Sequence, residues 1–325
     1  MLKSVTAPAE EASPRTFSEL VALSTRQYGL MTHAQAMAAG VNRMKLSRLV
    51  KSGVWEQVRP RVFRRAAKNQ TEEQELVALC LWLGEGTLVS HRSAARLLGL
   101  NLERGRPEVT TTRRKVRKIE GVVCHCAPLK TEDRRKHGKI PMTNGARTII
   151  DLASILDEDQ LAIVVEEAWR REIAKPSWVL ERLTELGVHG RSAAALAEIL
   201  ADCGNRKKAL ESALEVRMWH LLRKAKLPTP RGGYEFRDDY GQPGRIDIAY
   251  PDEGLAIECD GFEHHGTREA FETDRQRTQR LAALGWRVFQ VTSKHLDEEP
   301  ANIVKRVKEA LLHRTISKSS LRIST

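Results

Sequence analysis

The segment from Ile246 to Asp260 constrains the fold most strongly, because it holds two alternating runs on either side of a turn sequence. Apolar and polar residues alternate before and after the turn, which is the pattern of β-strands that have two different faces. The residues between the runs are Pro-Asp-Glu-Gly, a composition that favours a tight connection. The segment is therefore predicted to form a β-hairpin.

The turn determines which residues of this hairpin face each other. If Tyr250 pairs with Leu255, the register continues inward until Asp247 lies opposite Glu258. Opposed side chains in a sheet have Cβ atoms about 5 Å apart, so two carboxylates there repel each other unless a cation lies between them. Mg²⁺ or Mn²⁺ removes the conflict and accepts carboxylate ligands. We expect one face of the hairpin to bind a metal ion and the apolar reverse face to enter the core.

Further polar side chains are expected to reach the same place. A helix predicted over residues 209–222 carries Glu215, which we expect to be a third metal ligand. Two imidazoles follow the second strand and are candidates for orienting water or protonating a leaving group. The alternative is that the acids are solvent-facing residues of an edge hairpin. The predicted catalytic residues are Asp247, Glu258, Asp260, His264, His265 and Glu215, of which Asp247, Glu258 and Glu215 are the predicted metal ligands.

The spacing of these residues resembles that of a known nuclease family. Asp247 is followed, after ten intervening positions, by Glu-x-Asp-Gly, and later by Asp274-Arg275-x-Arg277 and Gly285-Trp286-Arg287-Val288. Together with Ser212-x-x-Glu215 and Leu227-Pro228-x-Pro230, the pattern resembles the Vsr-like (very-short-patch-repair) endonucleases of the PD-(D/E)XK superfamily. The resemblance covers about residues 205–313. It implies a mixed sheet flanked by helices and a metal-dependent DNA endonuclease.

One position departs from the superfamily pattern. The lysine that usually stands two residues after the glutamate is Asp260 here. The resemblance therefore implies that Arg275, Arg277 or a histidine supplies the missing positive charge, with Asp274 beside them. Asp274 and Arg275 also fit a simple ion pair on a helix surface.

The N-terminal region has helix-turn-helix spacing. Amphipathic segments are predicted over 17–27, 32–39 and 42–51, with Thr32 and Asn42 as N-caps and Gly40 ending the second segment. Residues 55–65 then alternate like two short strands around a basic turn, which predicts the wing of a winged helix. The alternative is a generic helical bundle whose basic residues serve solubility. The side chains predicted to bind DNA are Asn42, Arg43, Lys45, Arg48, Lys51, Arg59 and Arg61.

Three features of the middle region, residues 67–204, leave alternatives open. The basic run at 113–118 is either a solvated hairpin tip or a phosphate contact. His91 is either catalytic or the start of a helix capped by Ser90. Cys124-His125-Cys126 suggests zinc, but the alternation of 122–126 favours a strand and no second ligand pair follows at a suitable spacing.

The first half of the chain also resembles a known family. The residues that carry the resemblance are Gly29-Leu30-Met31-Thr32 through Phe63, Ser90-His91-Arg92-Ser93-Ala94-Ala95, Ile140-Pro141-Met142-Thr143 and Ala146-Arg147-Thr148-Ile149-Ile150-Asp151-Leu152-Ala153. This pattern is similar to the AbiEi-type antitoxin module of actinobacterial proteins. It implies a winged helix followed by a mixed middle domain, a role in transcriptional repression and a cognate toxin as a partner.

Charge and composition narrow the partners. The chain has 54 Lys and Arg against 42 Asp and Glu, a net charge of +12, which points to a polyanion such as nucleic acid. Charge does not separate DNA from structured RNA, but a helix in the major groove suits double-stranded DNA better. Five cysteines suit a reducing compartment, and neither a membrane-length apolar run nor a signal peptide stands out. We therefore expect a cytoplasmic protein without a membrane partner.

These observations predict a multi-domain α/β protein. Its predicted parts are a tail (1–15), a winged helix (16–66), a mixed α/β domain of AbiEi type (67–204), a Vsr-like endonuclease domain (205–315) and a second tail (316–325). The leading hypothesis is a DNA-binding protein that hydrolyses phosphodiester bonds with Mg²⁺ or Mn²⁺. The alternative is an AbiEi-like antitoxin or repressor whose nuclease-fold domain is not catalytic. Homodimerisation stays open.

Overall fold

The computed structural model describes residues 15–66, 71–112, 119–204, 206, 209–238, 240–260 and 268–312, and within 268–275 it describes the backbone alone. By its internal contacts the chain divides into two compact units, Met1–Asp151 and Leu152–Thr325, and each is described by itself. Both units contain helices and sheets, so the α/β fold class is confirmed. The domain limits predicted from the sequence stay predictions. Among the described residues, no helix has the length and apolar character needed to cross a bilayer.

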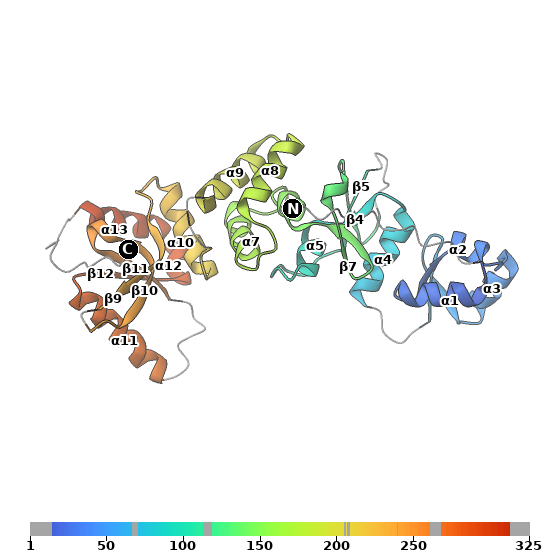
Figure 1. Ribbon diagram of the computed structural model, residues 1–325, viewed down its shortest axis with the longest axis horizontal. Helices are drawn as coiled ribbons and strands as arrows, with labels where there is room; N and C mark the ends of the chain where they lie inside the picture. The colour runs from blue at the N-terminus through green and yellow to red at the C-terminus, as the bar shows by residue number, and fades with distance from the viewer. Residues whose placement is uncertain are drawn as a thin grey trace. The chain divides into compact units, whose positions relative to one another are not determined.

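The first unit begins with a winged helix (Figure 1). Three helices start at residues whose side chains accept a hydrogen bond from the first turn, among them Thr32 and Asn42. Two antiparallel strands follow as the wing, and Val41, Leu46 and Trp55 pack in the core beneath. The predicted helices and wing are confirmed. The elements are α1 Phe17–Arg26, β1 Leu30–Thr32, α2 His33–Ala38, α3 Arg43–Lys51, β2 Trp55–Arg59 and β3 Val62–Arg65.

A mixed five-stranded sheet of order β6-β5-β4-β8-β7 forms the rest of this unit. Strand β5 is antiparallel to β4 but parallel to β6, so residues distant in sequence become neighbours across it. Helix α4 packs Leu76 and Leu79 against Val109 and Met142 of the sheet. The elements are α4 Glu72–Leu83, β4 Thr87–Val89, α5 His91–Leu97, β5 Glu108–Thr111, β6 Val123–Cys126, η1 Thr131–Asp133, β7 Arg134–His137, β8 Ile140–Thr143 and α6 Gly145–Leu152.

The second unit joins a helical part to a mixed sheet of order β12-β11-β10-β9. Helix α7 packs against α9 and α10, and α10 in turn packs against β10 and β11. The elements are α7 Glu158–Arg170, α8 Pro176–Leu186, α9 Arg191–Gly204, α10 Ala213–Lys224, β9 Arg231–Arg237, β10 Pro243–Tyr250, η2 Pro251–Glu253, β11 Leu255–Asp260, α11 Arg268–Ala283, β12 Arg287–Thr292, α12 Ser293–Glu298 and α13 Pro300–Leu312.

Strands β10 and β11 are the predicted hairpin, and their register is the predicted one. Ile248 pairs with Ile257 and Tyr250 with Leu255, across a turn whose Gly254 has a left-handed φ of 61°. Both strands lie in the middle of the sheet, because β9 and β12 occupy its edges. The alternative of an edge hairpin is therefore wrong.

The two faces of this hairpin are less different than the sequence suggested. Ile248 and Ile257 on one face are fully buried, and so are Ala249 and Ala256 on the other, which cluster with Leu281 of α11. The small alanines allow the helix to approach the sheet, so the carboxylate face is also covered along part of its length. Any chemistry on that face is confined to the end of the hairpin away from its turn.

Candidate functional site

Three carboxylates lie near the end of the β10–β11 hairpin that is away from its turn. Asp247 and Glu258 are the next positions in the register after the Ile248–Ile257 pair. Asp247 Oδ2 accepts a hydrogen bond from the Cys259 backbone N–H at 2.9 Å, which fixes its side chain across the two strands. Glu258 is only 5% exposed, so its carboxylate is shielded from bulk water. Such buried charge is stable only beside compensating groups.

Glu215, on α10, is the third carboxylate of this group. The sequence predicted that it lies near the other two. Ser212 caps this helix by accepting a hydrogen bond from the Glu215 N–H at 3.1 Å, which places the glutamate in the first turn. Burial, together with the negative charge of Asp247, raises the pKa of Glu215. Burial and the surrounding carboxylates, led by Asp247 and Glu215, also raise the pKa of the Cys259 thiol well above its usual range. Both pKa shifts come first from burial and then from the concentration of negative charge at this place.

Two arginines offset that charge. Arg277 Nη2 lies 2.6 Å from Glu258 Oε2 and 3.9 Å from Asp247 Oδ1. Arg245 Nη2 lies 3.3 Å from Glu215 Oε2, and its Nη1 lies 3.9 Å from Asp247 Oδ1. The sequence predicted that a cation offsets the repulsion between the carboxylates and proposed a metal ion for this role. Guanidinium groups, with their fixed charge and several donors, already reduce that repulsion.

A cavity of about 340 Å³ opens beside these groups. Three guanidinium groups and one carboxylate line it, so its charge favours an anion that also contacts the acids. Arg280 is held in place by Asp238 at 2.8 Å. Clustered arginines bind the phosphates of nucleic acid, because each guanidinium can donate two parallel hydrogen bonds. The residues that line the cavity are Phe236, Pro243, Gly244, Arg245, Asp247, Gln276, Arg277 and Arg280.

The donor atoms here are of the chemical type that the predicted metal ion prefers. Mg²⁺ and Mn²⁺ prefer oxygen ligands, and a few carboxylates plus water complete their shell. Asp247, Glu258 and Glu215 supply such oxygens within one charge cluster. Arg277 competes with a metal ion for the same oxygen of Glu258. Within the described residues, these three carboxylates do not bring ligand atoms within 4.8 Å of one another. Their role as metal ligands therefore stays a prediction.

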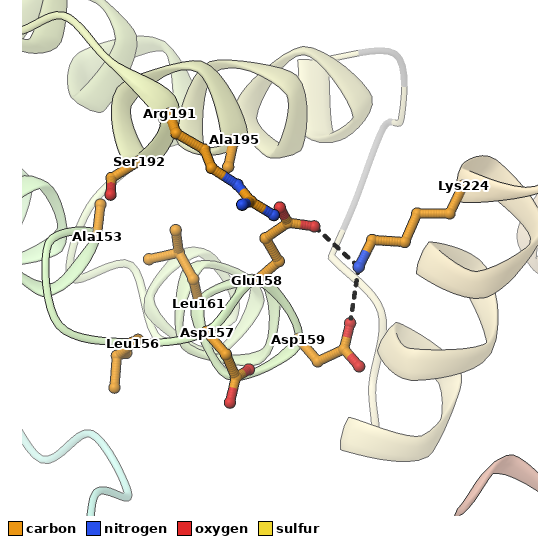
Figure 2. A pocket seen from close by; sticks show the side chains of 10 residues that line it. All are labelled: Ala153, Leu156, Asp157, Glu158, Asp159, Leu161, Arg191, Ser192, Ala195 and Lys224. Carbon is orange, nitrogen blue, oxygen red and sulfur yellow. Dashed lines mark ion pairs between the residues drawn. The ribbon is translucent and has the colours of Figure 1, made fainter.

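A second cavity in this unit, of about 410 Å³, is larger but less suited to chemistry (Figure 2). Lys224 Nζ reaches across from α10 to Glu158 at 2.8 Å and to Asp159 at 3.7 Å, so these charges neutralise one another. Lys224 lies nine residues beyond Glu215 on the same helix, which is roughly 13 Å along the axis. This cavity is separate from the carboxylate cluster and is a weaker candidate for a reaction.

The other predicted site residues have different outcomes. Asp260 ends β11 opposite Thr292 and is partly exposed. His264 and His265 lie outside the described residues, so their predicted roles stay predictions. Asp274 and Arg275 lie on α11, but their side chains also fall outside the description. Arg277 is the predicted charge-supplying residue that the structure places against Glu258.

Arg245 was not among the predicted site residues, although the sequence contains a signal for it. It precedes Asp247 by two positions on β10, and residues two apart on a strand share a face. A search for basic residues on the carboxylate face would have found it. Its guanidinium joins Glu211 and Glu215 of the α10 region to the sheet.

The predicted DNA-binding side chains lie on one helix and the adjoining wing. Asn42 caps α3 by accepting a hydrogen bond from the Lys45 N–H at 2.9 Å. Arg61 is exposed at the tip of the wing, where its φ is 64°. Arg59 instead pairs with Glu75 at 3.1 Å, which reduces its freedom to bind phosphate. The exposed basic side chains of α3 are Arg43, Lys45, Arg48 and Lys51.

Two family models match the chain. Residues 18–66 match AbiEi_4, described as a transcriptional regulator, AbiEi antitoxin, and this region is the winged helix. Residues 229–311 match the restriction-endonuclease-like family REase_MTES_1575, and this region contains Arg245, Asp247, Glu258 and Arg277. The chain thus combines an AbiEi antitoxin domain with a restriction-endonuclease-like domain.

Two curated relatives come from Mycobacterium tuberculosis, one from strain CDC 1551 and one from strain ATCC 25618. Each is 28% identical over 121 residues, which is 37% of this chain. The match covers 44% of each relative, so the chain spans less than half of their length. Both are named uncharacterized proteins, so their names assign no activity.

Proposed function

We propose that this protein binds double-stranded DNA and that its C-terminal domain hydrolyses phosphodiester bonds there with a divalent metal ion, in the manner of Vsr-like endonucleases. One observation carries the proposal. Three carboxylates and two arginines meet beside a cavity that is itself lined by arginines. Carboxylates suit the ion, and arginines suit the phosphate on which it acts.

Each side chain has a role in this proposal. Asp247, Glu258 and Glu215 hold Mg²⁺ or Mn²⁺, which when bound polarises a phosphoryl oxygen and lowers the pKa of water. Arg245 and Arg277 bind the phosphate and offset the negative charge that grows on it during hydrolysis. Arg277 fills the place left by the missing lysine, since it already contacts Glu258. Asp260, His264 and His265 stay proposed as groups that orient water or transfer protons.

The winged helix supports binding to DNA. Helix α3, the second helix of the helix-turn-helix, exposes four basic side chains. Arg61 is exposed at the tip of the wing. A helix of this kind fits the major groove of B-DNA, while basic groups beside it bind the phosphates. The match to an AbiEi antitoxin further supports a cognate toxin as a partner.

A second candidate function is a repressor or antitoxin whose nuclease-fold domain does not cut. The observation that favours it is the ion pairing of Glu258 with Arg277 and of Glu215 with Arg245. These contacts balance the carboxylates without a metal ion, as a site that has lost its reaction would require. A nuclease fold alone does not establish turnover.

A plasmid assay separates the two functions. Supercoiled DNA is incubated with the full chain and either Mg²⁺ or Mn²⁺, and nicked and linear products are measured. We expect cleavage by the wild type, and loss of cleavage with a chelator or with Asp247→Ala or Glu258→Ala. The matched control is Asp252→Ala, an exposed acid in the turn of the same hairpin. Equal rates in all variants would exclude this site, and DNA binding without cleavage by the wild type would favour the repressor.

A further inference from the structure

Three metal-binding side chains that the proposed nuclease does not use meet in the first unit. His91 begins α5, Glu108 begins β5 and His125 lies on β6. The parallel pairing of β5 with β6 places His125 beside Thr110, two residues from Glu108 on the same face. One ligand atom of each of the three lies within 4.8 Å of those of the other two.

The two imidazole rings are held face to face. Their centroids are 3.4 Å apart and their planes are inclined by 14°. His125 Nε2 lies 3.1 Å from Glu108 Oε2. His91 and Glu108 are each 4% exposed, whereas the His125 side chain is 24% exposed and keeps the cluster open to solvent on one side. The in-plane lone pairs of two stacked rings do not converge, so an ion that binds both imidazoles requires the more exposed ring, that of His125, to turn.

A hydrogen-bond chain fixes the ring of His91. Its Nδ1 lies 2.9 Å from Ser90 Oγ, which in turn accepts a hydrogen bond from Thr110 Oγ1 at 2.8 Å. This contact leaves Nε2 of His91 as the nitrogen not engaged by Ser90, in the way that outer hydrogen bonds orient metal-binding histidines. Ser90 is the N-cap residue of α5, as expected, but its hydroxyl makes no capping hydrogen bond to the helix.

The backbone of His91 is also held in an uncommon conformation. Its φ is +51°, in the left-handed region that side chains other than glycine rarely adopt. Such positions persist where surrounding structure enforces them, and they are frequent at ligand-binding sites. Here the conformation turns the first residue of α5 so that its ring stacks on His125.

Two arginines lie around the cluster. Arg92 Nη1 lies 3.5 Å from Glu108, and Arg147 is buried between Asp133 at 3.1 Å and Asp151 at 2.8 Å. These contacts hold Glu108 and the surrounding framework in place.

We infer that His91, Glu108 and His125 form a binding site for a divalent transition-metal ion of the zinc class. Two imidazoles and one carboxylate suit Zn²⁺ or Co²⁺, whereas the all-carboxylate cluster of the second unit suits Mg²⁺. Ligand atoms about 2.0–2.1 Å from a tetrahedral ion lie about 3.3 Å apart, close to the observed spacing of His125 and Glu108. Three protein ligands leave one position for water or another ligand. The site does not rest on the proposed nuclease function.

Cobalt and zinc titrations of the full chain test this site. The chain carries Asp247→Asn to weaken ion binding by the carboxylate cluster, and is first freed of metal by a chelator. We expect one equivalent of Co²⁺ to produce the visible absorption of a four-coordinate ion, and Zn²⁺ to displace it. His125→Ala and Glu108→Gln should weaken binding by at least about 100-fold, since even the loss of an outer hydrogen-bond partner costs about 10- to 100-fold. The matched control, His137→Ala, removes an exposed histidine from β7 of the same sheet and should bind normally.

Each outcome decides the inference. Circular dichroism confirms that the variants are folded, and Glu108→Gln keeps the shape of the side chain. Failure of the metal-free chain to bind either Co²⁺ or Zn²⁺ overturns the site, whatever the variants do. Equal binding by this chain and by both ligand variants overturns it as well.

Discussion

The two units of the chain each gather three side chains of metal-ligand type beside arginines, but they arrange them differently. In the second unit, Arg277 contacts a ligand directly, lies 40% exposed and borders an open cavity. In the first unit, Arg147 is almost fully buried and is held by Asp133 and Asp151 rather than by the histidines. One arginine is placed to meet an incoming anion, while the other fixes the framework around the cluster.

The two clusters also differ in the chemical type of their side chains. Carboxylates bind hard ions that exchange readily and keep several waters, as hydrolysis of a phosphodiester requires. Imidazoles bind zinc-class ions more tightly. The comparison therefore separates a site suited to turnover from one suited to holding an ion, within a single chain.

The largest expected effect is on DNA cleavage, and it comes from a substitution in the carboxylate cluster of the second unit. Asp247→Asn should reduce Mg²⁺-dependent DNA cleavage by at least about 10³-fold, because a bound metal contributes several kcal/mol to the transition state. The same variant should keep the Co²⁺ absorption of the His91–Glu108–His125 cluster. Plasmid nicking rates and Co²⁺ spectra on one protein sample measure both. A parallel loss of both signals would mean that the two clusters are not independent.

The next effect concerns the buried arginine of the first unit. Arg147→Leu leaves Asp133 and Asp151 without this guanidinium in a buried place, and should lower the free energy of unfolding by about 3–5 kcal/mol. Urea denaturation followed by tryptophan fluorescence measures the change.

Arg277→Leu is the matched comparison for that change. Its side chain is 40% exposed, so solvent screens part of the charge left on Glu258 and the loss should be smaller than that of Arg147→Leu. Mg²⁺ should restore the stability by binding the freed carboxylates. Mg²⁺ should not restore Arg147→Leu. Equal losses, or equal rescue, would remove the distinction between the two arginines.

The carboxylate site was largely predictable from the sequence because its information is local. Pro-Asp-Glu-Gly sets the register of β10 and β11, and the register alone places Asp247 near Glu258. Glu215 was added because it lies on the helix predicted over residues 209–222. The helix, α10, instead begins at Ala213, so Glu215 falls in its first turn. The sequence named Arg277 only as one of several candidates for the missing positive charge, and Arg245 was overlooked; the structure places both against these acids.

The histidine cluster was missed because its information is not local. Residues 123–126 were correctly predicted as a strand, and zinc was set aside for want of a second ligand pair nearby. The missing ligands are His91 and Glu108, which the parallel pairing of β5 and β6 brings close to His125. Alternation identifies a strand but does not choose its neighbour. A search restricted to sequence spacing therefore cannot find this type of site.

A smaller effect tests whether DNA affinity belongs mainly to the first unit. Replacing Arg43 and Arg48 together by Ala should weaken duplex binding roughly 10-fold and reduce the magnitude of the salt slope by about 2, because two phosphate contacts are lost. The matched control replaces Lys305 and Lys308, two exposed lysines of α13 in the second unit, and removes the same charge. Fluorescence anisotropy at several salt concentrations measures both. If the control loses as much affinity, charge rather than the winged helix governs binding.

The smallest effect concerns the cap that positions the basic helix. Asn42→Ala removes the acceptor for the Lys45 N–H and should cost about 1 kcal/mol, whereas Ser47→Ala, at an exposed position of the same helix, should stay within about 0.5 kcal/mol. Asn42→Asp keeps a capping oxygen and adds a negative charge, so thermal stability should be preserved while DNA affinity falls. Calorimetry and anisotropy together distinguish the two roles of this residue. Unchanged affinity in Asn42→Asp would show that the N-terminus of α3 does not approach the phosphates, and would place the contact on the wing instead.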